Sequence, residues 1–345
     1  MDILNNAVIT YDCIKASVDV TEKELADFSV EKGDILFQRS SETLEDVGRA
    51  NVYMDDKAAV FGGFVIRGKK KGEYDPQYFN YLLRSPFARK RIIPMGAGAQ
   101  HFNIGQEGLS KVKLHFANIE EQKKIGKMLS LLDERISTQN KIIEDLKKLK
   151  SAIIEIEYTP NTKTTSPIGD VIEQISKRNK NNAIQNVLSV SNRQGFIKQS
   201  EQFENRNVAS EDTSNYKIVE QNDFAFNPAR INVGSIARLT TFEKGIISPM
   251  YICFRTQENV APEYIDFFFE SKHFYCEIQK RLEGSVRQCL SFEGLCNIPF
   301  SLPSLEMQQR IGKRLFTLGQ KIKTETDLLE LLNKQKQYLL RQMFI

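Results

Sequence analysis

Two stretches of the chain carry apolar residues spaced alternately three and four positions apart, which is the heptad pattern of a coiled-coil seam. Each stretch is preceded by a residue suited to cap a helix, Asn118 or Ser304, and by acidic residues in the first turn. We therefore predict two long helices, over residues 118–157 and 304–345. Their predicted apolar seam residues are Leu129, Leu132, Ile136, Ile143, Leu146 and Ile153 in the first helix, and Leu315, Leu318, Ile322, Leu329, Leu332 and Leu339 in the second.

Polar residues interrupt the two seams at matching positions. Gln139 in the first seam corresponds to Glu325 in the second, and Lys150 corresponds to Lys336. Polar seam residues fix the register and the number of helices in coiled coils, but they also suit frayed or solvent-facing positions, and the sequence leaves both interpretations open. Since the first helix leads away from its domain and the second leads back to the end of the sequence, we predict that the helices pack antiparallel.

The matching seams belong to an internal repeat that covers most of the chain. An offset of 186 residues superposes Gln122 on Gln308, and nearer the N-terminus an offset of 189 superposes Asp34 on Asp223. Further pairs at the offset of 186 are Gly48 with Gly234, Tyr78 with Tyr264, and Gly98 with Gly284. A repeat of this length is a duplicated domain and not a solenoid unit, so we predict pseudo-twofold symmetry.

The two copies differ at their beginnings. By the same alignment Met1 falls opposite Val190, so the first copy has no counterpart to residues 167–189. We expect either a shortened gene or a segment supplied by another chain, and the sequence does not choose between them.

Each copy places strands and short helices before its long helix. In the first copy, residues 28–37, 47–53 and 58–66 are rich in β-branched and aromatic residues and are broken by glycines, which indicates strands and turns. Asp75 and Pro76 then supply an acidic cap and a first-turn proline for a helix. We predict an α+β fold class. The predicted parts are residues 1–117 (first domain, shortened at its start), 118–157 (first helix), 158–166 (threonine-rich linker), 167–303 (second domain) and 304–345 (second helix).

Composition narrows the class of protein. The 345 residues exceed what one hydrophobic core usually organises, which agrees with two domains. No stretch has the roughly 18 consecutive apolar residues of a membrane span, and the N-terminal residues lack the pattern of a secretion signal, so we expect a cytoplasmic protein with no membrane partner. The five cysteines form no C-x-x-C pair and the three histidines lie apart, so we expect no disulfide and no metal site.

No stretch of the sequence carries a supported catalytic constellation. Residues 63–70 approach a phosphate-binding loop but lack the Ser or Thr that binds magnesium. Residues 227–230 lack the second proline and the aromatic residue of the base-methyltransferase motif. No Ser/His/Asp, Cys/His or paired-carboxylate set has a clear partner. We therefore expect a chain that is not an enzyme by itself and needs no cofactor.

The helix beginnings resemble a known family. Residues 302–312 (LPSLEMQQRIG) and their counterpart 119–126 (IEEQKKIG) are similar to the PLPPLxEQxxIxxxL entrance to the conserved helix of type I restriction-modification specificity (S) subunits. Residues 222–227 and 231–236 resemble the GDixfn…GxiG portion of the target-recognition domains of this family, and residues 31–37 do so too. The resemblance covers nearly the whole chain, twice.

This resemblance implies two target-recognition domains, each reading one half of a split target in double-stranded DNA, held apart by two antiparallel conserved helices. It also implies protein partners: two methylation (M) subunits on the helices, and restriction (R) subunits in the full nuclease. At 1.5 Å per residue the seam from Leu129 to Ile153 is about 36 Å long, close to one turn of B-DNA at about 34 to 36 Å. We expect the helix pair to act as a ruler. The alternative is a coiled-coil scaffold, or an inactive remnant, with degenerate recognition domains.

A DNA reader needs Arg and Lys for phosphates, and polar side chains on loops for base edges. The loops that follow Gly98 and Gly284 occupy equivalent positions but carry different side chains, as expected if each copy reads different bases. Any single candidate is also compatible with an ordinary solvated surface residue, so the hypothesis concerns the set. The candidate DNA-binding residues are Arg39, Arg49, Lys69, Lys70, Lys71, Gln100, His101 and Asn103 in the first domain, and Arg193, Lys198, Arg206, Arg230, Asn232, Arg238, Arg287 and Gln288 in the second.

Overall fold

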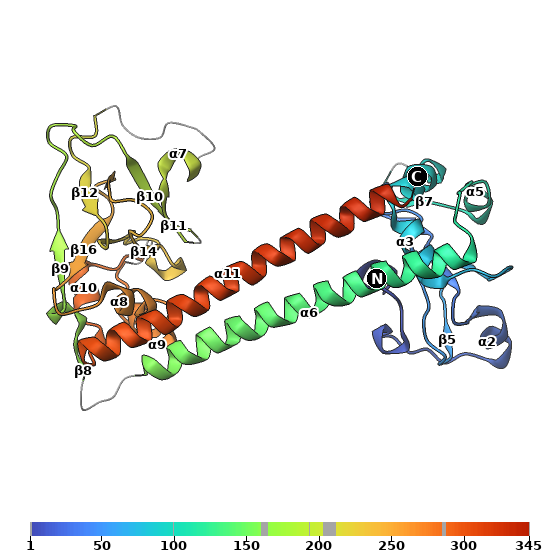
Figure 1. Cartoon of the computed structure of the whole chain (residues 1–345), viewed down its shortest axis with the longest axis horizontal. Helices are drawn as coiled ribbons and strands as arrows, with labels where there is room; N and C mark the ends of the chain where they lie inside the picture. The colour runs from blue at the N-terminus through green and yellow to red at the C-terminus, as the bar shows by residue number, and fades with distance from the viewer. Residues whose placement is uncertain are drawn as a thin grey trace. The chain divides into compact units, whose positions relative to one another are not determined.

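The computed structural model describes residues 2–98, 100–159, 165–192, 194–202, 212–284 and 288–344. The chain divides into two compact units: Met1–Ile142 with Glu325–Ile345 forms unit 1, and Ile143–Thr324 forms unit 2. The two long helices, α6 (Ile119–Glu157) and α11 (Leu305–Gln342), contribute residues to both units (Figure 1). Each unit therefore contains a globular part, the first half of the helix that follows it, and the second half of the other long helix.

The globular part of unit 1 holds three small antiparallel sheets. Strand β2 lies between β4 and β6, β1 pairs with β5, and β3 pairs with β7. Helices α3 and α4 pack against the three-stranded sheet through a core that includes Val47, Leu83 and Ile92. Its elements are α1 (Asp2–Asn5), η1 (Tyr11–Cys13), α2 (Glu22–Phe28), β1 (Ser29–Val30), β2 (Ile35–Gln38), β3 (Ser40–Ser41), β4 (Ala50–Val52), β5 (Ala59–Val60), β6 (Val65–Gly68), α3 (Pro76–Arg84), α4 (Pro86–Ile92), η2 (Ile93–Met95), β7 (Phe102–Asn103) and α5 (Gln106–Ser110).

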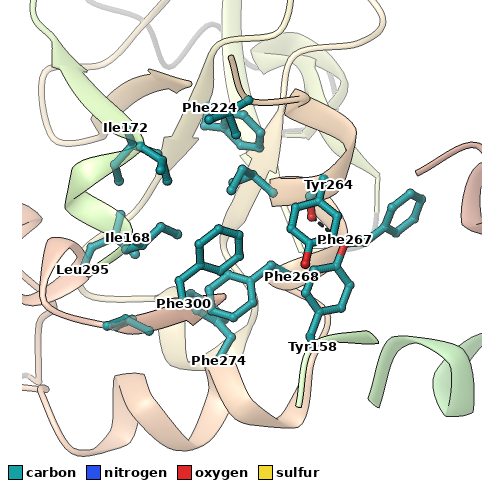
Figure 2. Packing of buried hydrophobic residues seen from close by; sticks show 14 of the residues in the cluster. Tyr158, Ile168, Ile172, Phe224, Tyr264, Phe267, Phe268, Phe274, Leu295 and Phe300 are labelled. Atoms are coloured by element: carbon teal, nitrogen blue, oxygen red, sulfur yellow. Dashed lines mark hydrogen bonds between the residues drawn. The ribbon is translucent and has the colours of Figure 1, made fainter. Parts of the chain in front are cut away.

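The globular part of unit 2 has two four-stranded sheets, in the orders β14-β13-β16-β9 and β11-β10-β15-β12, and the pair β17-β8. Its core is aromatic: Figure 2 shows Phe268 against Phe300, whose ring centroids lie 4.8 Å apart. Its elements are β8 (Thr165–Pro167), η3 (Ile168–Asp170), β9 (Ile172–Ile175), β10 (Val187–Ser191), β11 (Gly195–Lys198), α7 (Gln199–Gln202), β12 (Lys217–Glu220), β13 (Phe224–Phe226), η4 (Ile231–Val233), β14 (Ile236–Arg238), β15 (Lys244–Ile247), β16 (Ile252–Thr256), α8 (Pro262–Phe268), α9 (Lys272–Gln279), α10 (Phe292–Cys296) and β17 (Pro299–Ser301).

Strand register shows the duplication at the level of single residues. In unit 1, Leu36 on β2 pairs with Asn51 on β4 and with Arg67 on β6. In unit 2, Ala225 on β13 pairs with Ala237 on β14 and Cys253 on β16. These partners are related by the two offsets found in the sequence, 189 for the central strand and 186 for its neighbours. The three-residue step between the offsets therefore lies in the connection after the central strand.

The two sheets differ at one edge. Strand β16 lies between β13 and β9, whereas β6 has β2 on one side and no strand from the described residues of unit 1 on the other. Three apolar residues of the unit 1 core are also less buried than their counterparts in unit 2. Leu109, Val112 and Leu114 are half-buried, while their counterparts in unit 2 are at most 1% exposed. Those counterparts are Leu295, Ile298 and Phe300.

A glutamine fastens each long helix to its globular part. The Gln122 side chain accepts a hydrogen bond from the Asp75 backbone N–H at 2.9 Å and donates one to the Ala117 carbonyl at 2.7 Å. Gln308 makes the same two bonds in unit 2, with the Ala261 N–H and the Pro303 carbonyl, each at 2.9 Å. The cap predicted at Asn118 is confirmed, because its side chain accepts from the Glu121 N–H at 3.0 Å.

Gly126 allows α6 to cross α3 closely. A Cβ at this position would lie 2.6 Å from a carboxylate oxygen of Asp75 and 3.0 Å from the backbone nitrogen of Tyr78. Asp75 caps α3 by accepting from the Tyr78 N–H at 2.7 Å, as the sequence predicted. The glycine is therefore required by the approach of the two helices and not by helix propensity, which is poor for glycine.

The two long helices pack antiparallel, as predicted. In unit 1, Asp133 of α6 pairs with Lys336 of α11, and Gln139 pairs with Glu325. Residue numbers therefore rise along α6 as they fall along the facing part of α11. In unit 2, Glu157 of α6 pairs with Arg314 of α11 at 3.5 Å. All twelve predicted apolar seam residues are buried or half-buried.

The polar seam residues are not frayed or solvent-facing. Gln139 and Glu325 are buried and bond to each other. Lys336 lies 5.9 Å from the Tyr81 ring centroid and pairs with Asp133 at 2.5 Å. Its counterpart Lys150 lies 5.1 Å from the Phe267 ring and pairs with Glu270 at 2.6 Å. Cation–π contacts and ion pairs therefore hold both lysines against the globular parts.

Aromatic residues at the C-terminal ends of the long helices complete the cores. In unit 2, Tyr158 at the end of α6 stacks near Tyr264 with ring centroids 4.8 Å apart and donates to its backbone carbonyl at 2.6 Å (Figure 2). In unit 1, Phe344 beyond α11 packs on Tyr78 at 5.3 Å. The offset of 186 relates both members of the two pairs. Among the described residues, neither α6 nor α11 nor any shorter helix has the apolar stretch that a bilayer span needs.

Candidate nucleic-acid interface

A two-stranded ribbon gathers four of the candidate residues of unit 1. Ser40 on β3 pairs with Asn103 on β7, and the Ile104 N–H donates to the Arg39 carbonyl at 2.9 Å. A bridge between Ala97 and Asn103 closes the loop that carries Gln100 and His101. We call residues 97–103 the first reading loop. The side chains of Arg39, Gln100, His101 and Asn103 are all exposed.

Unit 2 closes a loop at the equivalent position with the same backbone contacts. Glu283 bridges Cys289, as Ala97 bridges Asn103, and the Leu290 N–H donates to the Pro228 carbonyl at 3.0 Å. We call residues 283–289 the second reading loop. Arg230 and Gln288 are exposed beside this closure. Arg287 lies outside the described residues.

Glycine with a positive φ begins both reading loops. Gly98 has φ 142° and Gly284 has φ 106°. A Cβ at Gly98 would lie 1.9 Å from the His101 carbonyl oxygen, so this turn admits no side chain. The loops therefore share a glycine at this position, while other positions differ between the copies, such as Ala97 and Glu283.

Asn103 is held in one orientation within the first reading loop. Its side-chain oxygen accepts from the Ser40 hydroxyl at 2.5 Å, and its amide nitrogen donates to the His101 carbonyl at 3.4 Å. A fixed, exposed amide is the kind of group that forms paired hydrogen bonds with a base edge. The position of Asn103 therefore suits direct readout.

The remaining candidates of unit 1 lie apart from the loop or are partly engaged. Arg49 is exposed but pairs with Asp46 at 2.7 Å. Lys69, Lys70 and Lys71 are exposed and follow β6, at the end of that strand opposite to the ribbon. The structure therefore does not bring these lysines together with Arg39 and Asn103.

Among the candidates that the structure describes, Arg238 in unit 2 pairs with two carboxylates. Its side chain is 9% exposed and pairs with Glu263 at 2.7 Å and Asp266 at 3.1 Å. Burial raises the pKa of Asp266, and the positive charge of Arg238 acts against that rise. Arg238 therefore joins β14 to α8 through two ion pairs. Its contact with DNA stays a prediction.

The other candidates of unit 2 are dispersed. Lys198 is exposed at the end of β11, and Asn232 is half-buried in η4, where it lines a cavity of about 290 Å³. Arg193 and Arg206 lie outside the described residues. Of the second set, only Arg230 and Gln288 are therefore seen beside a reading loop.

Two exposed apolar side chains occupy equivalent positions in the two copies, and sequence reasoning missed them. Phe64 is 77% exposed, and its carbonyl accepts from the Arg39 N–H at 2.8 Å. Its counterpart at the offset of 186, Met250, is 56% exposed. The sequence shows that both positions are apolar at the offset of the repeat, but base-edge candidates chosen for polar side chains do not include Phe or Met.

Two observations on the described residues concern metal binding and thiol chemistry. No group of three or more His, Cys, Asp or Glu side chains within them is placed to hold a metal ion. Burial raises the pKa of the Cys253 thiol to about 12, so this residue is not a thiolate nucleophile at neutral pH.

Comparison with known proteins agrees with the two-copy architecture. Residues 1–148 and 160–334 match the family described as the type I restriction modification DNA specificity domain. The chain is 26% identical over 351 residues to a Methanocaldococcus jannaschii protein named for the specificity subunit of the type I restriction enzyme MjaX, over 93% of this chain and 78% of that protein. The MjaVIII specificity subunit of the same organism is 24% identical over 358 residues, with the same coverage.

Among solved structures, the S subunit of a type I restriction-modification system from M. genitalium superposes with a TM-score of 0.55. The superposition covers 92% of this chain and 84% of that one at 16% identity. At this identity the likeness concerns the fold alone: two mixed domains with two long helices that pack together.

Proposed function

The chain belongs to the type I restriction modification DNA specificity family, and from that premise we propose that it reads the DNA target of a type I restriction-modification complex. One observation carries the proposal. Both copies close an equivalent loop with the same backbone contacts, yet they place different side chains around it. Two loops that share a backbone framework but carry different side chains suit a DNA target made of two different half-sites.

We assign the reading to the loops and their neighbours. Asn103 and Gln288 carry amides suited to base edges, and Arg39 and Arg230 suit guanine or phosphate. Phe64 and Met250 present apolar surface suited to the thymine methyl group. The recognition domains would be residues 1–117 and 167–303. The other candidates named from the sequence, including Arg287 in the second reading loop, belong to the same proposal.

We further propose that the chain is not itself an enzyme and that two M subunits bind to its long helices, with R subunits completing the nuclease. Helix α6 exposes apolar side chains outside its seam, among them Leu131 at 55%, Leu149 at 50% and Ile156 at 75%. Leu149 and Ile156 are seven residues apart and so share one face of α6, and apolar surface gathered on one exposed face favours a protein partner. These side chains support the docking of a partner on the helices.

The proposal is tested with the M–S complex formed by this chain and its neighbouring methylase. Sequencing of modified bases gives the target, and DNA binding is then measured for Asn103→Ala. The control is Asn181→Ala, at an exposed asparagine outside both the long helices and the candidate set. We expect Asn103→Ala to cost about 1 to 3 kcal/mol of discrimination at one half-site only. Equal affinity for target and random duplexes would instead favour the coiled-coil scaffold.

A further inference from the structure

A small cavity in unit 1 is lined by arginines. It has a volume of about 270 Å³ and lies between α1, the segment around Arg49, and helices α3 and α4. Arg49, Arg84 and Arg89 all line it, together with one carboxylate, Glu45. The other acidic group nearby is Asp46, which already pairs with Arg49. Three guanidinium groups thus face one space with fewer negative charges around it.

One donor in this cluster has no partner. Arg89 uses Nη2 to donate to the Glu45 carbonyl at 2.8 Å and the Val47 carbonyl at 2.7 Å. Its Nη1 is buried and meets no hydrogen-bond acceptor among the described residues. A buried charged donor without an acceptor is costly, and such groups normally bind something.

The backbone fixes the arginines in place. Arg84 donates to the Ala50 carbonyl at 3.3 Å and to the Asn6 carbonyl at 2.9 Å. Burial, followed by the positive charge of Arg49, lowers the pKa of Arg89 to about 10. Burial also lowers the pKa of Arg84. Tyr81 and then Asp133 act against that decrease. The three arginines around the cavity outnumber the two carboxylates there, Glu45 and Asp46.

Unit 2 has the equivalent cavity with different chemistry. That cavity measures about 290 Å³, and Glu270 and Tyr275 line it at the positions of Arg84 and Arg89. Glu270 is paired with Lys150 at 2.6 Å. The repeat therefore provides a hollow of similar size in both units, and only the hollow of unit 1 is lined by several arginines.

We propose that the arginine-lined cavity of unit 1 is a binding site for a phosphate-type anion. Planar guanidinium groups suit the oxygens of phosphate, and two or more of them around one anion satisfy its charge. The anion is either a free phosphate or a phosphate of the DNA backbone. The site shares Arg49 with the candidate DNA-binding residues of the proposed function and adds Arg84 and Arg89, which were not among them.

Binding is tested first without DNA. The full chain is titrated with inorganic phosphate in a calorimeter, at constant ionic strength maintained with chloride. We expect saturable binding that weakens about tenfold or more in Arg89→Gln, because one charge-assisted contact is lost. Arg49→Gln is the second variant, since the Arg49 side chain is half exposed and its replacement spares the fold. Arg91→Gln, on the same helix as Arg89 but outside the cavity, should bind as the unchanged chain does.

A second arm identifies the source of the anion. If a DNA phosphate occupies the cavity, inorganic phosphate competes with duplex binding. Arg89→Gln, which lies outside the candidate DNA-binding set, then weakens binding to all sequences as Arg49→Gln does, and the slope of log affinity against log salt concentration falls by about one. If a free phosphate occupies it, both variants lose phosphate binding and keep their DNA affinity. Identical phosphate titrations for the unchanged chain, Arg89→Gln and Arg49→Gln would overturn the proposal, whatever happens at the reading loops.

Discussion

The side-chain amide of Gln139 donates to a carboxylate oxygen of Glu325 at 2.5 Å and to the Glu325 backbone carbonyl at 3.0 Å. Glu325 lies 186 residues after Gln139, which is the offset of the repeat, so each residue contacts its own counterpart. In an antiparallel pair of equivalent helices, such a contact lies where the local twofold axis crosses the seam. Only one register places these two polar groups opposite each other, so the pair fixes the alignment of α6 with α11.

The first prediction concerns this pair. Gln139→Leu should lower the free energy of unfolding by about 1 to 3 kcal/mol, because it removes the amide that donates to the buried Glu325 carboxylate. The double variant Gln139→Leu with Glu325→Leu should be at least as stable as the unchanged chain, because two apolar side chains then complete the seam. Urea denaturation followed by circular dichroism measures both. Gln335→Leu, at an exposed position of α11, is the control and should have little effect.

The second prediction separates two glycines in the long helices. Gly126→Ala should destabilise unit 1, since the new methyl group would meet the Asp75 carboxylate at 2.6 Å and disturb the cap of α3. Gly319→Ala should stabilise the chain by about 0.5 to 1 kcal/mol, because nothing lies within 4 Å of the added Cβ and alanine favours the helix. Thermal unfolding of the two variants gives the comparison. A destabilised Gly319→Ala would contradict the open surroundings of that residue.

The third prediction tests the ruler. Inserting four residues into both α6 and α11 lengthens each helix by about 6 Å, near two base pairs at 3.4 Å each. We expect the gap between the two half-sites to grow by about two base pairs while each half-site keeps its sequence. Mapping of methylated bases in cells that carry the variant measures the gap. An unchanged gap would refute the proposal that the helices set the spacing.

The fourth prediction concerns the uncovered edge of β6. Amide hydrogens of β6 should exchange at least about tenfold faster than those of β16, because β16 has strands on both sides and β6 on only one. The central strands β2 and β13 each lie between two neighbours and provide the control, with protection expected to be more alike. Hydrogen exchange read by mass spectrometry follows all four strands. Equal protection of β6 and β16 would show that the edge is covered in solution.

The long helices and the duplication were predictable because they depend on periodic or repeated residues. The heptad spacing of residues such as Leu129 and Leu315 predicts a buried stripe wherever a second helix lies beside it. The offset between Gln122 and Gln308 predicts equivalent positions without any knowledge of contacts. The amide bonds of Gln122 to Asp75 and Ala117 were not predictable, since they join segments whose approach depends on the whole domain.

The candidate site was predicted less completely, for the same reason. Sequence reasoning placed Gln100, His101 and Asn103 on one loop, because they are neighbours in the chain. Sequence reasoning could not distinguish Arg39 from Arg238. The β3–β7 ribbon brings Arg39 to the first reading loop, whereas two carboxylates bind Arg238. A charge on the surface and a charge in an ion cluster look alike in a sequence. Only the fold distinguishes them.

The contact between Phe344 and Tyr78 has a consequence for how the protein is made. Tyr78 is synthesised early and Phe344 comes near the end of the sequence, so the core of unit 1 stays incomplete while the ribosome translates all of unit 2. In unit 2 the corresponding aromatic residue, Tyr158, precedes the globular part in the sequence. All residues of unit 2 are therefore synthesised before Phe344. The domain that is translated first is therefore the one that finishes folding last.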